Sequence, residues 1–394
     1  MKKTVISLLI VAIMISLTDI QSIAEDEGEE LDQNEVEEDL EGFFESPTIE
    51  NQWQDLLNEY RDYMPLDSGN QWRDITDEES IFSWRAWVDG IVSFLIDELL
   101  ANGQTLSLLI FITLLSAVLN VLAQSFETQT VTKVSQFVIF GVLMTIAMTG
   151  FHTAANFTTD TIETMRHFMV SLLPLFLSMM AAFGHVATVA FFNPFILFLT
   201  QASGLFVAKI IIPLLFLSAI LHIASHVNET YNLSRLAHLF KQGALLLMGA
   251  FLSVFLTIMS VQGITTAASD GVAVRAAKFV TSNFIPVIGR MFTDATDTVL
   301  SASILVKNTI GVAGLVVLFV MILFPILKVL VLGLVFRLAA AILQPVADGP
   351  VVHMVDDMGK HILYLLLALL MVSIMFFFSI VMLIVISNTS LMVR

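Results

Sequence analysis

Ionisable residues inside long apolar runs are the side chains most able to do chemistry in this sequence. Lys328 follows Pro325 by three residues, and Arg337 lies further along the same run. A charge near the bilayer centre costs at least about 2.5–3.5 kcal/mol on insertion scales, so such residues usually face a bundle interior or water. Lys328 could instead satisfy a carbonyl freed by Pro325, or extend to the surface. For Lys328, a functional role inside the bundle and a structural role at a carbonyl or the surface both remain open. For Lys209, which lies four residues before Pro213, the structural role is favoured.

A polar segment between two apolar runs, residues 272–300, is the second candidate site. It contains five ionisable residues, one asparagine and one proline, which are the candidate positions: Arg275, Lys278, Asn283, Pro286, Arg290, Asp294 and Asp297. These side chains cannot face lipid. The segment could enter the membrane as a broken or re-entrant helix that lines an aqueous cavity. The alternative, which is slightly favoured, is an amphipathic helix and loop on the membrane surface.

Motifs for catalysis and cofactor binding are missing from the sequence. The chain has no cysteine and eight histidines, none of them in an HExxH pair, and it contains no G-x-x-x-x-G-K-[ST] phosphate loop. We therefore expect no enzymatic activity and no cofactor. Any work driven by ATP would need a partner subunit.

Long apolar runs define the class of fold. A helix rises about 1.5 Å per residue, so about 20 apolar residues cross a hydrocarbon core of roughly 30 Å. Such runs must be helical, because the core offers no water to an unpaired backbone. Each of the following reads as one span or a tight pair of spans: 106–123, 137–153, 168–190, 195–223, 244–262, 310–335 and 362–386. The sequence predicts an all-α polytopic membrane domain over 105–394.

The N-terminus predicts export. Residues 1–24 combine two lysines, an apolar stretch and a small-residue site, which indicates a signal peptide cleaved between Ala24 and Glu25. Residues 25–50 then hold thirteen acidic side chains and no lysine or arginine. A segment so acidic repels itself and has little apolar surface to bury, so we expect 25–48 to be disordered and exported. It is unsuited to binding nucleic acid or anionic lipid.

Residues 49–104 predict an exported amphipathic helical region that carries all four tryptophans. Trp53 belongs to one helical pattern that ends at Pro65, and Trp84 and Trp87 belong to a second. The favoured interpretation is that these helices lie in the lipid headgroup region. The alternative is a docking surface for another exported domain.

A weak internal repeat would relate 137–224 to 249–336. With an offset of 112, Arg166 falls on Lys278, Pro174 on Pro286, and Pro213 on Pro325. A cleaved signal and seven spans would leave Arg394 in the cytoplasm. If 272–300 crosses fully, the count becomes eight and the second half inverts. The basic residues flanking the spans do not decide between these topologies.

Four strings in the second half carry a family resemblance: KFVTSNFIPV at 278–287, LVKN at 305–308, PILK at 325–328 and LAAAILQPVAD at 338–348. They resemble the stage III sporulation protein AE family of endospore-forming bacteria. The order of signal peptide, acidic exported segment and polytopic domain matches as well. The strings contain no catalytic signature.

The resemblance implies a component of a channel or secretion complex that links mother cell and forespore and is required after engulfment. It implies a multi-pass protein of the mother-cell membrane, with its acidic segment outside the cytoplasm. The implied partners are an ATPase subunit, small membrane subunits and ring-forming subunits of the intermembrane space. An autonomous secondary transporter and a passive membrane scaffold remain alternatives.

Overall fold

Ten helices and one π-helical turn make up the part of the chain that the structure describes. The computed structural model describes residues 47–64, 84–125, 129–182, 186–227, 233–284, 288–345 and 349–392. The first half contains α3 (Pro47–Tyr60), η1 (Arg61–Tyr63), α4 (Trp84–Ala101), α5 (Gly103–Ser125), α6 (Gln129–Ala182) and α7 (Val186–Phe206). The second half contains the π-helical turn η4 (Val207–Ile211), α8 (Ile212–Val227), α9 (Ser234–Phe284), α10 (Ile288–Leu343) and α11 (Pro350–Met392). No strand occurs within these ranges, which confirms the predicted all-α class.

Five helices are long and apolar enough to cross a membrane, or six if the bent α4–α5 pair is one span, counted over the described ranges. The five windows are Phe137–Pro174, Ile196–His226, Ser234–Val261, Gly311–Leu343 and Pro350–Ile384. The pair Trp84–Ala101 and Gly103–Val118 bends by 47°. The structure therefore supports a polytopic membrane protein with five or six spans, and seven or eight spans remain a prediction.

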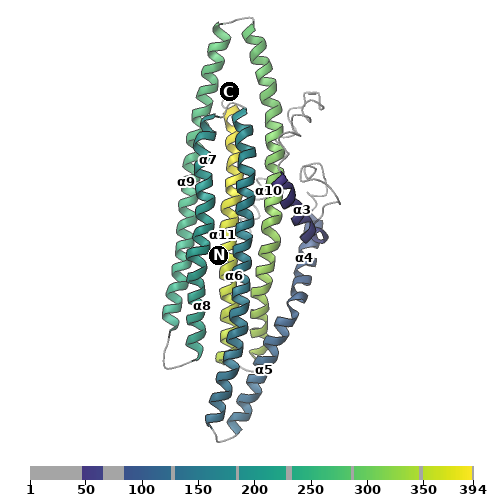
Figure 1. The fold of residues 1–394 in the computed structure, drawn as a ribbon, viewed down its shortest axis with the longest axis vertical. Helices are drawn as coiled ribbons and strands as arrows, with labels where there is room; N and C mark the ends of the chain where they lie inside the picture. The colour runs from purple at the N-terminus through teal and green to yellow at the C-terminus, as the bar shows by residue number, and fades with distance from the viewer. Residues whose placement is uncertain are drawn as a thin grey trace.

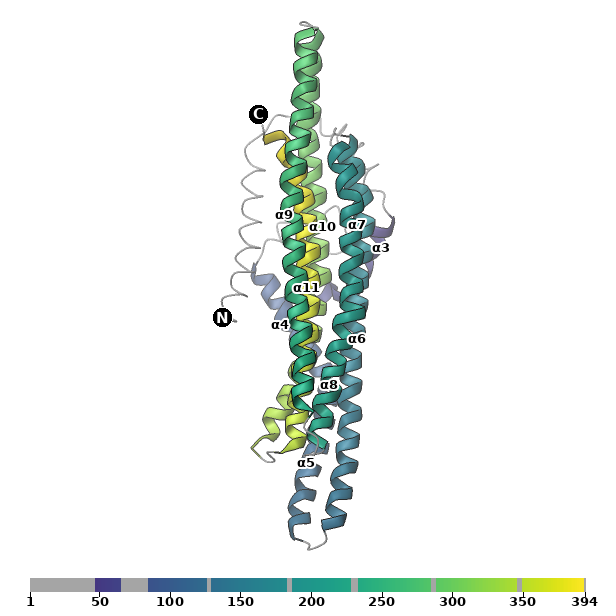
Figure 2. The same ribbon diagram turned by 90° about the vertical axis from the view of Figure 1, so that its left-hand side faces the viewer.

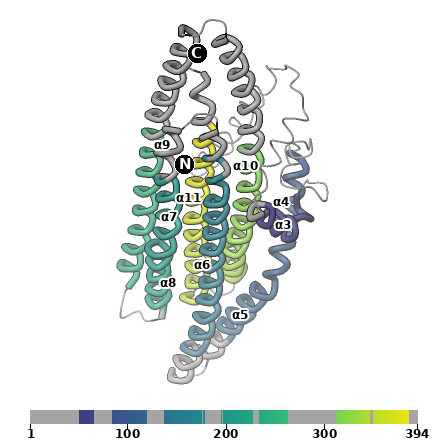
Figure 3. The backbone as a smooth tube through the Cα atoms, turned by 45° about the horizontal axis from the view of Figure 1, so that its top comes forward, coloured from purple at the N-terminus to yellow at the C-terminus, as the bar shows by residue number. Residues whose placement is uncertain are grey.

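Helices α6 to α11 lie side by side along the long axis, with α11 in the middle of the bundle (Figures 1 and 2). α11 packs against α10, α6, α9 and α8. Its side chains between Met354 and Leu383 are largely buried. Figure 3 shows the same arrangement with α4 and α5 crossing the outside of the bundle at a slant.

One continuous helix, α6, contains both apolar runs that the sequence suggested as separate spans, 137–153 and 168–190 up to Ala182. The intervening polar residues do not interrupt it. Thr159, Thr161 and Thr164 each donate a hydroxyl hydrogen to the carbonyl four residues earlier, so these hydroxyls are satisfied inside the helix. The proposed repeat is not established by this arrangement.

Two glycines set the distance between α10 and α11. A Cβ built on Gly359 would lie 3.0 Å from the Gly333 carbonyl oxygen and 3.1 Å from the Arg337 backbone nitrogen. Only a residue without a side chain fits this crossing, as at many membrane helix contacts. The close approach places Arg337 of α10 beside the first turns of α11.

Candidate functional site

Lys328 lies near the middle of the apolar part of α10, where its ammonium group faces an aromatic ring. Its Nζ is 4.7 Å from the centroid of the Phe157 ring of α6. Such a contact contributes about 0.5–2 kcal/mol, depending on desolvation. Within the described part of the chain, no carboxylate lies within 4.0 Å of this Nζ. The sequence suggests Asp294, Asp297 or Asp348 as an acidic partner of Lys328, and the side chains of all three lie outside the described residues.

Arg337, the second predicted intramembrane charge, pairs with α11. Its Nε donates to Asp356 Oδ1 at 3.3 Å. Lys360 Nζ lies 2.7 Å from Asp356 Oδ2, so one carboxylate accepts from two cations. The sequence spacing explains the second contact, because residues four apart share a helix face. The glycine crossing explains the first.

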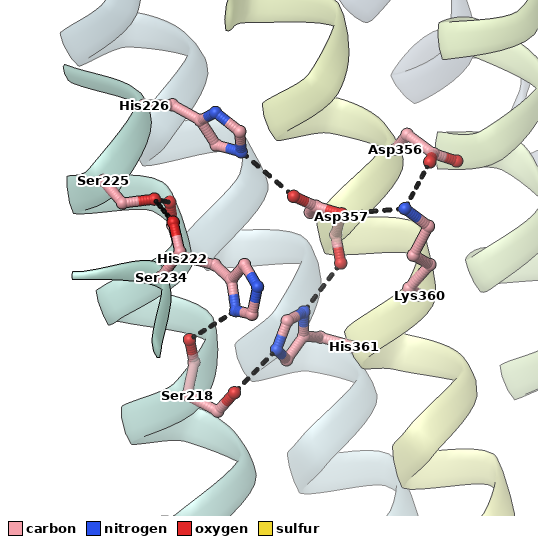
Figure 4. A network of polar contacts seen from close by, with 9 residues as sticks. All are labelled: Ser218, His222, Ser225, His226, Ser234, Asp356, Asp357, Lys360 and His361. Carbon is pink, nitrogen blue, oxygen red and sulfur yellow. Dashed lines mark hydrogen bonds and ion pairs between the residues drawn. The ribbon is translucent and has the colours of Figure 1, made fainter. Parts of the chain in front are cut away.

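Asp357 joins α11 to α8. Its Oδ2 lies 3.0 Å from His226 Nε2, and its Oδ1 accepts from Lys360 Nζ at 2.9 Å. The side chains of Asp357 and His226 are only 19% and 23% exposed. Because the two residues are 131 positions apart in the chain, this contact ties the C-terminal end of α8 to the start of α11 (Figure 4).

His361 extends this polar network into the bundle core. Its Nδ1 lies 2.7 Å from the backbone carbonyl of Asp357, and its Nε2 lies 3.0 Å from Ser218 Oγ on α8. Ser218 Oγ also lies 2.8 Å from the Ala237 carbonyl of α9. When a neutral His361 donates through Nδ1, its Nε2 is an acceptor, so the single Ser218 hydroxyl hydrogen can go either to Nε2 or to the Ala237 carbonyl. All three contacts form together only when His361 is protonated on both nitrogens.

The serine, histidine and aspartate resemble a catalytic triad only in composition. His361 contacts the backbone carbonyl of Asp357, whereas the Asp357 carboxylate contacts His226 and Lys360. Ser218 is fully buried and within hydrogen-bond distance of Ala237. A nucleophilic serine needs an exposed oxygen and a base oriented by a third group. The geometry therefore fits a structural polar network that joins three helices.

Further imidazole rings surround this network. His222 forms edge contacts with His238 at 4.8 Å and with His361 at 5.1 Å between ring centroids. His226 stacks on His353 at 6.4 Å. Over the described residues, no three His, Asp or Glu side chains are arranged to hold a metal ion.

The predicted polar segment 272–300 falls on the C-terminal end of α9 and the N-terminal start of α10. Its backbone is helical in 272–284 and in 288–300. The side chains of Arg275, Lys278, Asn283, Arg290, Asp294 and Asp297 lie outside the described residues, as do Pro286, Ala24 and Glu25 altogether. Their proposed roles stay predictions.

The three tryptophans that are candidates for docking a partner, Trp53, Trp84 and Trp87, differ in their surroundings. Trp53 is buried at 2% exposure where α3 packs against the bundle, whereas Trp84 is 63% exposed. Trp87 forms an edge contact with Phe319 of α10, with 5.7 Å between ring centroids. Of the three, Trp84 is therefore the one that presents a surface to a partner or to lipid, and Trp53 anchors α3.

The sequence pointed to Lys328 and Arg337, but it did not single out Asp356, Asp357 and Lys360, the charged residues that cluster near Arg337. A local signal for these residues existed. Asp356 and Lys360 are four residues apart, and Asp357 and Lys360 are three apart, just before a long apolar run. The contacts to Ser218 and His226 had no local signal, because they are tertiary.

The fold and its polar network define a polytopic all-helical membrane protein with charged side chains between its helices. The chain belongs to the stage III sporulation protein AE family, whose model matches residues 66–387. Stage III sporulation protein AE of Bacillus subtilis (strain 168) is 42% identical over 342 residues, which cover 87% of this chain and 86% of that protein. No solved structure matches the chain. The resemblance seen in 278–348 is confirmed, and membership supports a role in sporulation.

Proposed function

We propose that the protein is a membrane-embedded component of a trans-envelope channel or secretion complex that links mother cell and forespore. It is required there for forespore development after engulfment. Family membership supports the sporulation context, and five or six apolar helices support the membrane location. The observation that carries the proposal is the half-buried Lys328 in the middle of an apolar helix.

Lys328 lies near the centre of an apolar window, where an uncompensated charge is costly. The apolar window of α10 covers 33 residues, Gly311–Leu343, which corresponds to about 50 Å of helix. Lys328 is near its midpoint, and Pro325 removes one backbone donor just before it. Charges at such positions mark substrate paths, relays and contacts that change with state. We assign Lys328 a contact that forms or breaks as the complex works.

The partners in this proposal are other stage III sporulation proteins. An ATPase subunit would supply the nucleotide chemistry, since the sequence has no phosphate loop of its own. Small membrane subunits would complete the bundle, and ring-forming subunits of the intermembrane space would meet the exported region around the exposed Trp84. The mother-cell membrane, with 25–104 outside the cytoplasm, is the corresponding location.

Cysteine accessibility of 272–300 tests whether this segment lines the path. Single substitutions Asn283→Cys, Val287→Cys, Arg290→Cys and Asp294→Cys, in a chain that has no native cysteine, should react with hydrophilic thiol reagents in a periodic pattern. Protection is expected partway along the segment. Uniform high reactivity would place the segment on the membrane surface and refute its role as a pore lining.

Reconstitution separates this function from that of an autonomous transporter. Purified protein in liposomes should not move small solutes unaided, because the proposed path requires the other subunits. Solute uptake by the purified chain alone would favour a secondary transporter. A passive scaffold would instead tolerate substitution of Lys328 and of every polar position in 272–300.

A further inference from the structure

A row of exposed polar side chains follows one face of α6. We call it the α6 polar stripe, and it consists of His152, Asn156, Asp160, Glu163 and His167. The successive spacings of four, four, three and four residues place these side chains on one side of the helix. The stripe covers about 22 Å, at 1.5 Å per residue. It lies inside the apolar window Phe137–Pro174.

Contacts with α10 fix the height of the stripe in the bundle. Phe157 of α6 faces Lys328, near the midpoint of the apolar window of α10. On the N-terminal side of Phe157, Gly150 of α6 lies against Phe336 of α10. On its C-terminal side, Leu172 of α6 lies against Gly314 of α10. The stripe is therefore level with the centre of the α10 window and does not lie beyond its end.

The outward surface of α6 changes character along the helix. Near the start of the window, Phe137, Val138 and Val142 are exposed, and these side chains suit lipid. From His152 to His167 the exposed positions are polar or charged. Ionisable residues at membrane depth face water or protein, because lipid exposure costs several kcal/mol for each charge.

The charges in the stripe are only partly paired within the chain. Glu163 forms an ion pair with Arg166, and Arg166 Nη1 donates to Gln201 Oε1 of α7 at 2.9 Å. Asp160 is exposed, and no cation lies within 4.0 Å of its carboxylate within the part of the chain that the structure describes. A carboxylate in this position needs hydration.

The short helix α3 adds a second polar surface at the same height. Tyr60 of α3 stacks on Phe324 of α10 with 4.5 Å between ring centroids, one turn from Lys328. α3 packs on both α6 and α10. Its opposite side exposes Asp55, Asn58 and Glu59, which cannot contact hydrocarbon. A helix with this outer face indicates water beside the bundle at the level of the stripe.

We propose that the α6 polar stripe and the outer face of α3 border a water-filled region that reaches the middle of the membrane. The region opens on the side of the exported N-terminal segment, because α3 belongs to that segment. Water is the occupant, since the stripe combines two carboxylates with an amide and two imidazoles, and α3 adds further carboxylates at the same height. This proposal rests on the membrane insertion that the proposed function also requires. It adds a wetted surface distinct from 272–300.

Single cysteines in the native, cysteine-free chain test this directly. Asn156→Cys, Asp160→Cys and Glu59→Cys are placed on the wetted surface. Val142→Cys lies on the apolar face of α6, and Leu205→Cys is an exposed apolar position on α7. Leu205 lies near the height of the stripe, because its neighbour Gly204 is against Ile162 and Arg166. Each variant is treated in intact protoplasts with a cationic, membrane-impermeant methanethiosulfonate, and modification is followed over time by mass.

We expect the three surface positions to react at least about tenfold faster than both controls, which corresponds to about 1.4 kcal/mol of protection at the controls. Equal, slow rates at Asp160 and Leu205 would overturn the proposal. Slow labelling of Asp160→Cys together with oxidant-induced disulfide dimers would overturn it as well and assign the stripe to an interface between copies. If the variants support normal spore formation while the stripe stays unreactive, the proposed function stands and this inference fails.

Discussion

Replacing Gly359 with alanine should weaken the contact between α10 and α11. The added Cβ would lie 2.5 Å from Arg337 Cγ, 3.0 Å from the Gly333 carbonyl oxygen and 3.1 Å from the Arg337 nitrogen. Two of these three atoms belong to the backbone, so a rotamer change cannot relieve the overlap. Overpacking of this kind costs about 1–3 kcal/mol. Since about 1.4 kcal/mol is a factor of ten, the unfolded fraction should rise between about fivefold and 150-fold.

Equilibrium unfolding of purified protein in detergent, followed by circular dichroism, measures this change. Gly249→Ala is the matched control, because a Cβ there meets nothing within 4 Å. It should gain about 0.5–1 kcal/mol from helix propensity. Gly333→Ala should have an intermediate effect, since its nearest neighbour is the flexible Leu363 side chain at 2.9 Å. If Gly359→Ala is as stable as the parent protein, the close crossing and the placement of Arg337 that depends on it are wrong.

Three further results are expected. Asp357→Asn should lower the unfolding free energy by about 1–3 kcal/mol, because His226 and Lys360 lose a charged acceptor, and denaturant titration measures it. Trp53→Ala should cost about 3–5 kcal/mol in the same assay by leaving a cavity under α3, whereas Trp84→Ala should be nearly neutral; equal effects would contradict the docking of α3. Mass spectrometry of the membrane-purified chain should find Glu25 at the N-terminus, and an intact leader would refute cleavage.

Much of the fold can be predicted from the sequence, because apolar length is a strong signal. The runs at 310–335 and 362–386 correspond to the windows Gly311–Leu343 and Pro350–Ile384. The single helix α6 could not be predicted so well. Residues 154–167 are polar and resemble a loop between two spans, but threonine hydroxyls that bond to their own helix let it continue.

The candidate site was predictable only in part. Lys328 and Arg337 stand out because a charge in an apolar run is unusual. The pairing of Asp357 with His226 depends on how α8 packs on α11, and no local pattern encodes a contact across 131 residues. The α6 polar stripe has a helical period in the sequence, but its exposure at the height of Lys328 follows only from the register between α6 and α10.

Spore formation by a strain that carries Lys328→Met tests the central claim most directly. Methionine is only one atom shorter than lysine and removes its charge, and Lys328→Arg is the control that keeps the charge. We expect both variants to reach normal abundance in the membrane, with heat-resistant spores lost for Lys328→Met and retained for Lys328→Arg. Wild-type spore numbers with Lys328→Met at normal abundance would show that the lysine only caps a carbonyl or extends to the surface, and would contradict its role in the complex.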